Sequence, residues 1–314
     1  MAGSIFPAGT AEQAPRRTVM RGWSWSLGIA ALVGLLLAAV PEVASAAGRP
    51  GSAAAPTYYL ALGDSLAAGY QPRDLGALEP CGYQYGYACD LYQGMLAAHP
   101  HLEAVNLSCP GETTSSMLSG VGSPCYSGGP PQLARAVRFL AQHRGQVALI
   151  TIDFGANNVD GCVQSSGSIS PSCLLQGLAQ VEGQLPVILT ALRGAAGSGV
   201  PIVGMNYHDP FLAAYLAGET SLAQESLTVT GTFNQLLEGV YQRAGDQVAD
   251  VQSAFQTLNT ATDSTTGLPV DVERICQLTW MCGYSPPNIH PNATGYQVIA
   301  EAFAQVPAVA GLIS

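Results

Sequence analysis

A candidate nucleophile lies near the beginning of the chain. Residues 58–62 form an apolar run typical of a buried strand, and this run continues directly into Gly63-Asp64-Ser65. The glycine permits a sharp turn, and the residues after Ser65 fit the start of a helix. Because open α/β sheets place their reactive groups at the carboxyl ends of the strands, Ser65 is a candidate nucleophile. The alternative is a serine that caps a helix.

His290 is the candidate base for this serine. It lies in residues 287–292, just before an amphipathic run over residues 293–306, so we expect it in a loop that enters the last helix. An imidazole, whose pKa is ordinarily about 6.5, can accept the serine proton at neutral pH. Of the other four histidines, only His208 is a rival, because it follows an expected strand.

Two further strand ends supply amide donors. Residues 103–107 and 147–154 are expected strands, the first followed closely by Gly111 and the second by Asn157. A backbone N–H and an asparagine amide are suited to hold a carbonyl oxygen that becomes negative during acyl transfer. Glycine and asparagine are also common in ordinary turns, so each signal is ambiguous by itself.

Together, Ser65, Gly111, Asn157 and His290 resemble the motif blocks of the SGNH hydrolase superfamily, the GDSL-type lipases and esterases, in its secreted bacterial form. The resemblance extends from about residue 58 to the C-terminus. It implies that Ser65 is the nucleophile and first oxyanion donor, Gly111 the backbone donor, Asn157 the side-chain donor and His290 the general base. It also implies a flavodoxin-like, three-layer α/β/α sandwich with a parallel five-stranded sheet.

The chain departs from the family pattern at the group that orients the histidine. The family usually has an aspartate three residues before it, where this chain has Pro287, and the nearby Asn288 carries no charge. Some relatives are similar to a Ser-His dyad held by a main-chain carbonyl, which residues 280–286, beginning at Trp280, can supply. The possible orienters are therefore Asn288 and the main-chain carbonyl of Trp280. We expect the dyad held by a carbonyl, in which Asn288→Ala leaves most activity. The family commonly has aspartate at Asn158, which we interpret as structural.

The amino-terminal region has the pattern of a secretory signal peptide. Three arginines precede an apolar core over residues 27–40, and Ala44-Ser45-Ala46 is a small-residue cleavage site. The core is short for a membrane span, so we expect a secreted mature protein without one. The predicted divisions are a signal peptide over residues 1–46, a short tether over 47–56 and a hydrolase domain over 57–314. The pair Arg16-Arg17 leaves general and twin-arginine export open.

All eight cysteines follow this leader. An even number in an exported chain predicts a disulfide framework. The cysteines fall into four couples that are close in sequence, so the predicted bonds are Cys81–Cys89, Cys109–Cys125, Cys162–Cys173 and Cys276–Cys282. Each bond is expected to fix a loop beside the site. We expect no metal site, because Cys-x-x-Cys pairs and clustered histidines are absent from the sequence.

Composition and periodicity favour one acidic α/β domain. The chain has 21 acidic against 11 basic residues, which argues against a nucleic-acid partner. Strand and helix candidates alternate, as in a parallel sheet between helical layers. The strand candidates are residues 58–62, 103–107, 147–154, 201–206 and 247–251, and the helix candidates are 86–98, 131–143, 174–196, 222–244 and 293–306. Residues 259–286 lack clean periodicity and are expected to form a long loop.

These features predict a secreted, monomeric serine esterase or lipase that needs no cofactor and hydrolyses a small-molecule or lipid ester through an acyl-enzyme intermediate. The same residues could serve a carbohydrate (acetyl) esterase, a phospholipase or an acyltransferase, and the sequence does not separate these. An exported, catalytically inactive binding module is the alternative of another class. Loops at residues 74–87, 124–130 and 211–219 are expected to line the acyl pocket.

Overall fold

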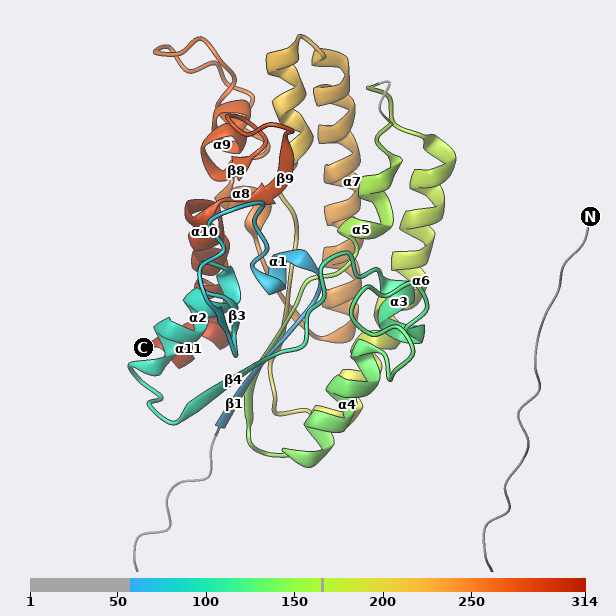
Figure 1. The fold of residues 1–314 in the computed structure, drawn as a ribbon, viewed down its shortest axis with the longest axis vertical. Helices are drawn as coiled ribbons and strands as arrows, with labels where there is room; N and C mark the ends of the chain where they lie inside the picture. The colour runs from blue at the N-terminus through green and yellow to red at the C-terminus, as the bar shows by residue number, and fades with distance from the viewer. Residues whose placement is uncertain (1–56, 165–166) are drawn as a thin grey trace, which may run out of the picture. The chain divides into compact units, whose positions relative to one another are not determined.

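A five-stranded parallel sheet forms the centre of the part of the chain that the computed structural model describes, residues 57–164 and 167–314 (Figure 1). The strand order is β4-β1-β5-β6-β7, and every neighbouring pair is parallel. All five predicted strands and the predicted flavodoxin-like topology are therefore confirmed. The strands are β1 (Thr57–Leu62), β4 (Leu102–Asn106), β5 (Val147–Ile152), β6 (Ile202–Met205) and β7 (Gln247–Ala249).

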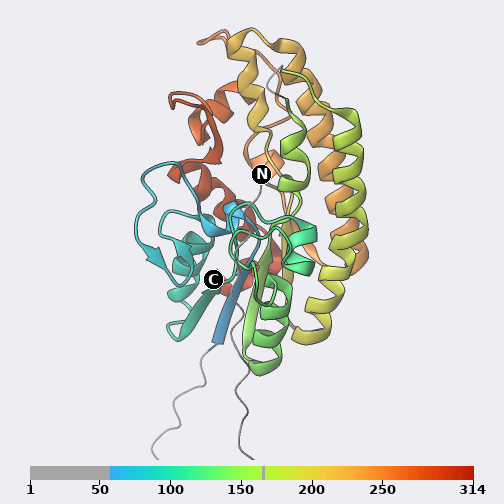
Figure 2. The same cartoon turned by 45° about the vertical axis from the view of Figure 1, so that its right-hand side comes forward.

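Helices cover both faces of this sheet, which makes the three predicted layers (Figures 1 and 2). The five predicted helices are present, with bounds that differ by a few residues. One layer contains α2 (Tyr87–Leu96), α10 (Ala293–Ala304) and α11 (Pro307–Ile313), and the other contains α4 (Gln132–Gln142), α6 (Pro171–Ala196) and α7 (Thr220–Ala244).

Burial on both faces explains the sequence pattern of the strands. In β1 the four residues from Tyr59 to Leu62 are all buried, and so is the whole of β6. Strands covered on both faces are continuous apolar runs, because neither set of alternating side chains meets water. Helix α6 instead buries one stripe, at Val181, Leu185, Ile188 and Leu192, with the spacing of a helix that packs on one side.

The expectation of a long loop over residues 259–286 is wrong, because α9 (Val270–Leu278) lies within it. The helix buries Val272, Ile275 and Leu278 on one face, and it carries Asp271 and Glu273 in its first turn. Only two helical turns repeat this pattern, which is too short for the periodicity to stand out from its polar surroundings.

His290 lies in a short strand, not in the expected loop. Strand β9 (Asn288–Pro291) pairs antiparallel with β8 (Thr279–Trp280), and Asn292 then caps α10 by accepting the N–H of Gly295. Strand β8 has only two residues, which is too short for an alternating pattern to predict the pairing. The remaining elements are α1 (Ser65–Ala68), β2 (Leu78–Glu79), β3 (Gly82–Tyr83), α3 (Thr114–Ser119), α5 (Ala156–Val159), α8 (Val251–Ala254), and the 3-10 helices η1 (Asp160–Cys162) and η2 (Pro210–Ala217).

All four predicted disulfide pairings are present in the structure. The predicted signal peptide over residues 1–46 and the tether over 47–56 lie outside the described residues. Within the described ranges, no individual helix has both the length and the apolar character of a membrane span, although α10 and α11, bent by 103°, pass that test as a pair.

The disulfide Cys109–Cys125 should make a measurable contribution to stability. It closes a chain segment of sequence separation 16, so replacing both cysteines with serine is expected to lower the free energy of unfolding by about 3 kcal/mol. Urea denaturation of this variant, with the exposed Ser127→Ala just after the closed segment as control, measures the loss. An unchanged unfolding free energy would show that the loop is held by other contacts.

Candidate active site

The chain turns sharply from β1 into α1 at Gly63. Its φ is +145°, and a Cβ there would lie 1.6 Å from Asp153 Oδ1, so only glycine fits. Gln132 accepts the Gly63 N–H through Oε1 at 2.9 Å and donates to the Gly63 carbonyl through Nε2 at 3.0 Å. The N–H of Asp64 donates to Asp153 Oδ1 at 2.8 Å. These contacts fix the position of Ser65, the first residue of α1.

Asp64, and not Ser65, caps helix α1. Its Oδ1 accepts the N–H of Leu66 at 3.0 Å, and its Oδ2 accepts a hydrogen from Asn157 Nδ2 at 3.0 Å. The side chain of Ser65 lies beside the same carboxylate. Burial raises the pKa of Asp64 and that of Asp153, and repulsion from Asp64 raises the latter further. Because Asp64 takes the capping role, the alternative of Ser65 as a helix cap does not hold.

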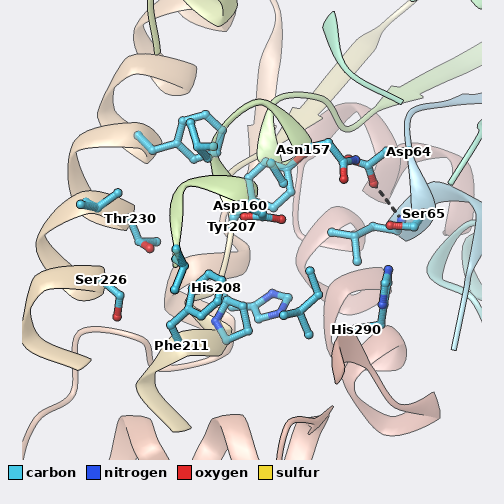
Figure 3. A pocket seen from close by; sticks show the side chains of 18 of the residues that line it. Asp64, Ser65, Asn157, Asp160, Tyr207, His208, Phe211, Ser226, Thr230 and His290 are labelled. Atoms are coloured by element: carbon cyan, nitrogen blue, oxygen red, sulfur yellow. Dashed lines mark hydrogen bonds between the residues drawn. The ribbon is translucent and has the colours of Figure 1, made fainter. Parts of the chain in front are cut away.

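His290 reaches the same pocket from β9. Asn288 Oδ1 accepts the main-chain N–H of His290 at 3.1 Å and lies 2.8 Å from its Nδ1. A main-chain N–H can only donate, so the amide oxygen must face the histidine, and Nδ1 therefore carries the proton. This leaves Nε2 as the free acceptor of the neutral ring. Figure 3 shows the ring pointing toward Ser65.

The structure gives the orienting contact to the side chain of Asn288, and not to a main-chain carbonyl of residues 280–286 as expected. Trp280 pairs with Asn288 across β8 and β9, and its Nε1 donates to Gln71 Oε1 at 3.2 Å. Through these two contacts, Trp280 stabilises the position of β9, the strand that carries His290. The expectation that Asn288→Ala leaves most activity is withdrawn, because this side chain determines which ring nitrogen holds the proton.

The electrostatic surroundings keep His290 neutral. Burial lowers the pKa of His290 to about 4. The edge of the Tyr70 ring packs against the imidazole, with 4.8 Å between ring centroids. Ser65 and His290 line one pocket, yet among the described residues no hydrogen bond joins their side chains; the serine side chain lies beside Asp64. A rotation of the serine side chain is needed before the proton can transfer.

His208, the rival base, lines the pocket, and its ring makes a hydrogen bond to the main chain of Ile289. Its ring stacks on Phe255 with 4.3 Å between centroids, and its buried Nδ1 has no hydrogen-bond partner in the described part of the chain. Burial lowers the pKa of His208 to about 3. Because the His208 ring is stacked and buried, whereas the His290 ring points toward Ser65 (Figure 3), His290 is the better placed base.

The predicted oxyanion donors, Gly111 and Asn157, line the same pocket. Gly111 lies in the turn between β4 and α3, with a φ of +83° that favours glycine. Asn157, in α5, donates from Nδ2 to Asp64 Oδ2 and to the main-chain oxygen of Glu112, both at 3.0 Å. Both amide hydrogens are engaged, so an oxyanion must replace one of these acceptors.

Asn158 has the structural role expected of it. Its Oδ1 accepts the N–H of Thr114 at 3.1 Å, and its Nδ2 donates to Thr114 Oγ1 at 3.0 Å and to Gln180 Oε1 at 3.1 Å. The side chain thus links α3 to α6, which holds the strand-end loops next to each other.

Two residues that hold the turn before Ser65 were missed in the sequence analysis. Asp153 could have been found, because it is a buried acid directly after an apolar strand. Gln132 could not, since a glutamine at the start of an amphipathic helix gives no signal of a contact with Gly63.

The pocket is a mostly apolar cavity of about 260 Å³ (Figure 3). Two of the three loops expected to line it, residues 74–87 and 124–130, do not, and the third contributes Phe211. The apolar wall comes mainly from the segment after α5 and from α6 and α7, at Val159, Val163, Ile169, Leu174, Val229 and Phe233. Over the described ranges, no group of three or more acidic, histidine or cysteine side chains is placed to hold a metal ion.

Comparison with known proteins supports these observations. The sequence matches the family model described as the GDSL-like lipase/acylhydrolase family over residues 61–298. No curated protein sequence matches significantly.

Several solved structures are similar to this chain, and the first two named here share its fold. A candidate GDSL-like lipase from Parabacteroides merdae has 15% identity and a TM-score of 0.52, over 82% of this chain and 96% of that one. Phospholipase A1 from Streptomyces albidoflavus has 18% identity and a TM-score of 0.52, over 79% and 98%. The acetylxylan esterase Axe2 from Geobacillus stearothermophilus has 16% identity and a TM-score of 0.47, over 79% and 93%.

The two hydrogen bonds between Gln132 and the main chain of Gly63 should contribute to stability. Gln132→Ala removes the acceptor of a buried N–H, so the free energy of unfolding should fall by about 2 kcal/mol. Gln142→Ala, at an exposed position of the same helix, is the matched control and should change it by less than about 0.5 kcal/mol. Equal denaturation midpoints for the two variants would contradict the role of Gln132.

Proposed function

The chain belongs to the GDSL-like lipase/acylhydrolase family, and we propose that it hydrolyses carboxylic esters through an acyl-enzyme intermediate on Ser65. One observation carries this proposal. Ser65, His290, Gly111 and Asn157 come from four separate segments and line a single pocket, where the Nδ1 of the histidine is held by Asn288.

In the first step, the Ser65 hydroxyl turns from Asp64 toward His290 Nε2 and attacks the carbonyl carbon of the ester. The histidine takes the serine proton and then gives it to the departing alcohol. Water, deprotonated by the same nitrogen, then attacks the acyl carbon. The bond from that carbon to Ser65 Oγ breaks, the histidine returns the proton to the serine oxygen, and the acid leaves. Catalytic hydrogen bonds that are long or absent in a free enzyme commonly form only when substrate is bound.

The oxyanion hole consists of the N–H groups of Ser65 and Gly111 and the amide of Asn157. As the carbonyl oxygen becomes negative, it is a stronger acceptor than the neutral carbonyl of Glu112, to which Asn157 donates in the free protein. The exchange of acceptors therefore favours the transition state over the bound ester, which is the condition for a faster reaction.

Asn288 orients the base without adding charge. A neutral amide selects the Nδ1 tautomer, but it stabilises the imidazolium formed during the reaction less than a carboxylate does. The lowered pKa of His290 is consistent with this arrangement, because burial without a neighbouring negative charge favours the neutral ring. The base therefore stays in its active form in acidic solution.

We also propose that the protein is exported. Four disulfides and the absence of unpaired cysteines among the described residues support an oxidising compartment. The signal-peptide pattern of residues 1–46 agrees with this proposal.

The pH dependence tests the role of the Asn288–His290 pair. The base must be neutral, so kcat/KM should fall only as the pH drops through the low pKa of His290, at about 4. Asn288→Asp places a negative charge beside the ring, and this should move the acid limb up by about 1 to 2 pH units. Asn288→Ala should lower kcat by about tenfold or more. An acid limb near pH 6.5 that neither variant changes would contradict this role.

Covalent labelling tests the nucleophile. A p-nitrophenyl alkylphosphonate should modify Ser65 in the folded protein, as located by peptide mass spectrometry, because it mimics the tetrahedral intermediate. Ser65→Ala should abolish labelling and lower hydrolysis of p-nitrophenyl esters by about 10³-fold or more, while the exposed Ser198→Ala should do neither. Labelling of another residue, or full esterase activity in Ser65→Ala, would refute the proposal.

A further inference from the structure

The mostly apolar pocket contains polar side chains that have no part in the proposed reaction: His208, Ser226, Thr230 and the two considered next, Asp160 and Tyr207. Asp160 begins η1, and Tyr207 lies just after β6. Both line the cavity, and in the view of Figure 3 they lie between the end that holds Ser65 and His290 and the helix α7. The charge of Asp160 is close enough to contribute to the raised pKa of Tyr207, which burial raises most.

The hydroxyl of Tyr207 is held in place without a hydrogen-bond partner. The residue is 5% exposed, and its Oη is buried with no partner among the described residues. Its main chain is fixed on both sides by Asn234, which accepts the N–H at 2.9 Å and donates to the carbonyl at 2.8 Å. The ring packs against Phe233. A buried hydroxyl that makes no hydrogen bond is unfavourable, so this one is suited to a partner that comes from outside.

The carboxyl of Asp160 is also without a partner in the described part of the chain, although the cavity gives access to it. Burial raises the pKa of Asp160 to about 8, with smaller contributions from Asp64 and Asp209. At neutral pH the group is therefore mostly a neutral acid, with one O–H donor and acceptor capacity. None of the residues that line the cavity is an arginine, so no side chain there neutralises it by forming an ion pair.

A hydroxyl group complements this pair. It can accept a hydrogen from the carboxylic acid or from Tyr207 and donate its own hydrogen to the other, so one atom satisfies both groups. An alkyl chain in the same place would leave both polar groups buried and unpaired, which makes its binding weaker. A site with such groups can discriminate strongly against an analogue that lacks the hydroxyl.

We propose that Asp160 and Tyr207 form a subsite for a hydroxyl group of the ester, so that hydroxylated esters are preferred over plain alkyl esters. This inference rests on the proposed function and narrows its substrate class. The subsite lies in the same cavity as Ser65, and neither of its two residues has a part in the proposed acyl transfer.

Two matched series of esters test this preference. One pairs methyl alkanoates with methyl ω-hydroxyalkanoates, and the other pairs alkyl acetates with ω-hydroxyalkyl acetates, each over increasing chain length. In at least one series, at the length that reaches the subsite, the hydroxylated member should have a kcat/KM about tenfold higher. The first series places the hydroxyl in the acid part of the ester, and the second places it in the alcohol part.

Variants of Tyr207 and Asp160 test whether these two residues cause the preference for hydroxylated esters. Tyr207→Phe removes only the unpartnered hydroxyl, so the melting temperature should stay equal or rise while the preference falls by about fivefold. Asp160→Leu should reverse the preference by raising kcat/KM for the plain ester, since the chain then meets an apolar wall. A fall in melting temperature of Tyr207→Phe with no change in preference would assign the hydroxyl a structural role and overturn the proposal.

Binding to Ser65→Ala protein separates this proposal from the proposed function. In this variant 1,ω-alkanediols should shift the NMR signals of pocket residues at lower concentrations than 1-alkanols do, and Tyr207→Phe in the same background should remove the difference. Esterase activity without any preference for hydroxyl, or tighter binding of ω-ammonio alcohols than of diols, would overturn the subsite and leave the esterase intact. Absence of phosphonate labelling at Ser65, with diol selectivity retained, would instead overturn the esterase.

Discussion

The buried carboxylate of Asp64 joins the separate strand-end loops into one site. It caps α1, which positions Ser65, and it accepts a hydrogen from Asn157 in α5. Its own N–H is fixed by Asp153 at the end of β5. Because three segments meet at this one side chain, a shift of any of them changes the geometry of the others. The apolar core beneath keeps these polar contacts away from competing water, which strengthens them.

The histidine is held by a different kind of contact. The neutral side chain of Asn288 orients the imidazole of His290. The tautomer of His290 therefore depends on a single amide, whose own orientation is determined by the main-chain N–H of His290. That arrangement depends in turn on the pairing of β8 with β9 and on the contact between Trp280 and Gln71. In the proposed reaction, a base that remains neutral in acid and a nucleophile that is fixed by buried contacts are compatible features of one hydrolase site.

The sheet and its main helices could be predicted because their signals are local: apolar runs for buried strands and helical stripes for α6 and α7. The strand-end positions of Ser65, Gly111 and Asn157 followed from the same pattern. Helix α9 could not be predicted because it has too few turns, and the β8–β9 pair could not because β8 has only two residues. The contact of Gln132 with Gly63 could not be predicted because it joins segments far apart in sequence. The acyl pocket was placed partly in the wrong loops for the same reason, since α7 reaches it only through the fold.

The central claim is that a hydroxyl, an imidazole and two amide donors converge on one reacting carbon. A crystal structure of the protein inhibited by an alkylphosphonate tests it most directly. We expect phosphorus bonded to Ser65 Oγ, its phosphoryl oxygen about 3 Å from the N–H of Gly111 and from Asn157 Nδ2, and His290 Nε2 facing the serine oxygen. An adduct whose oxygen points away from both donors, with Asn157 still bound to Asp64 and Glu112, would contradict the account.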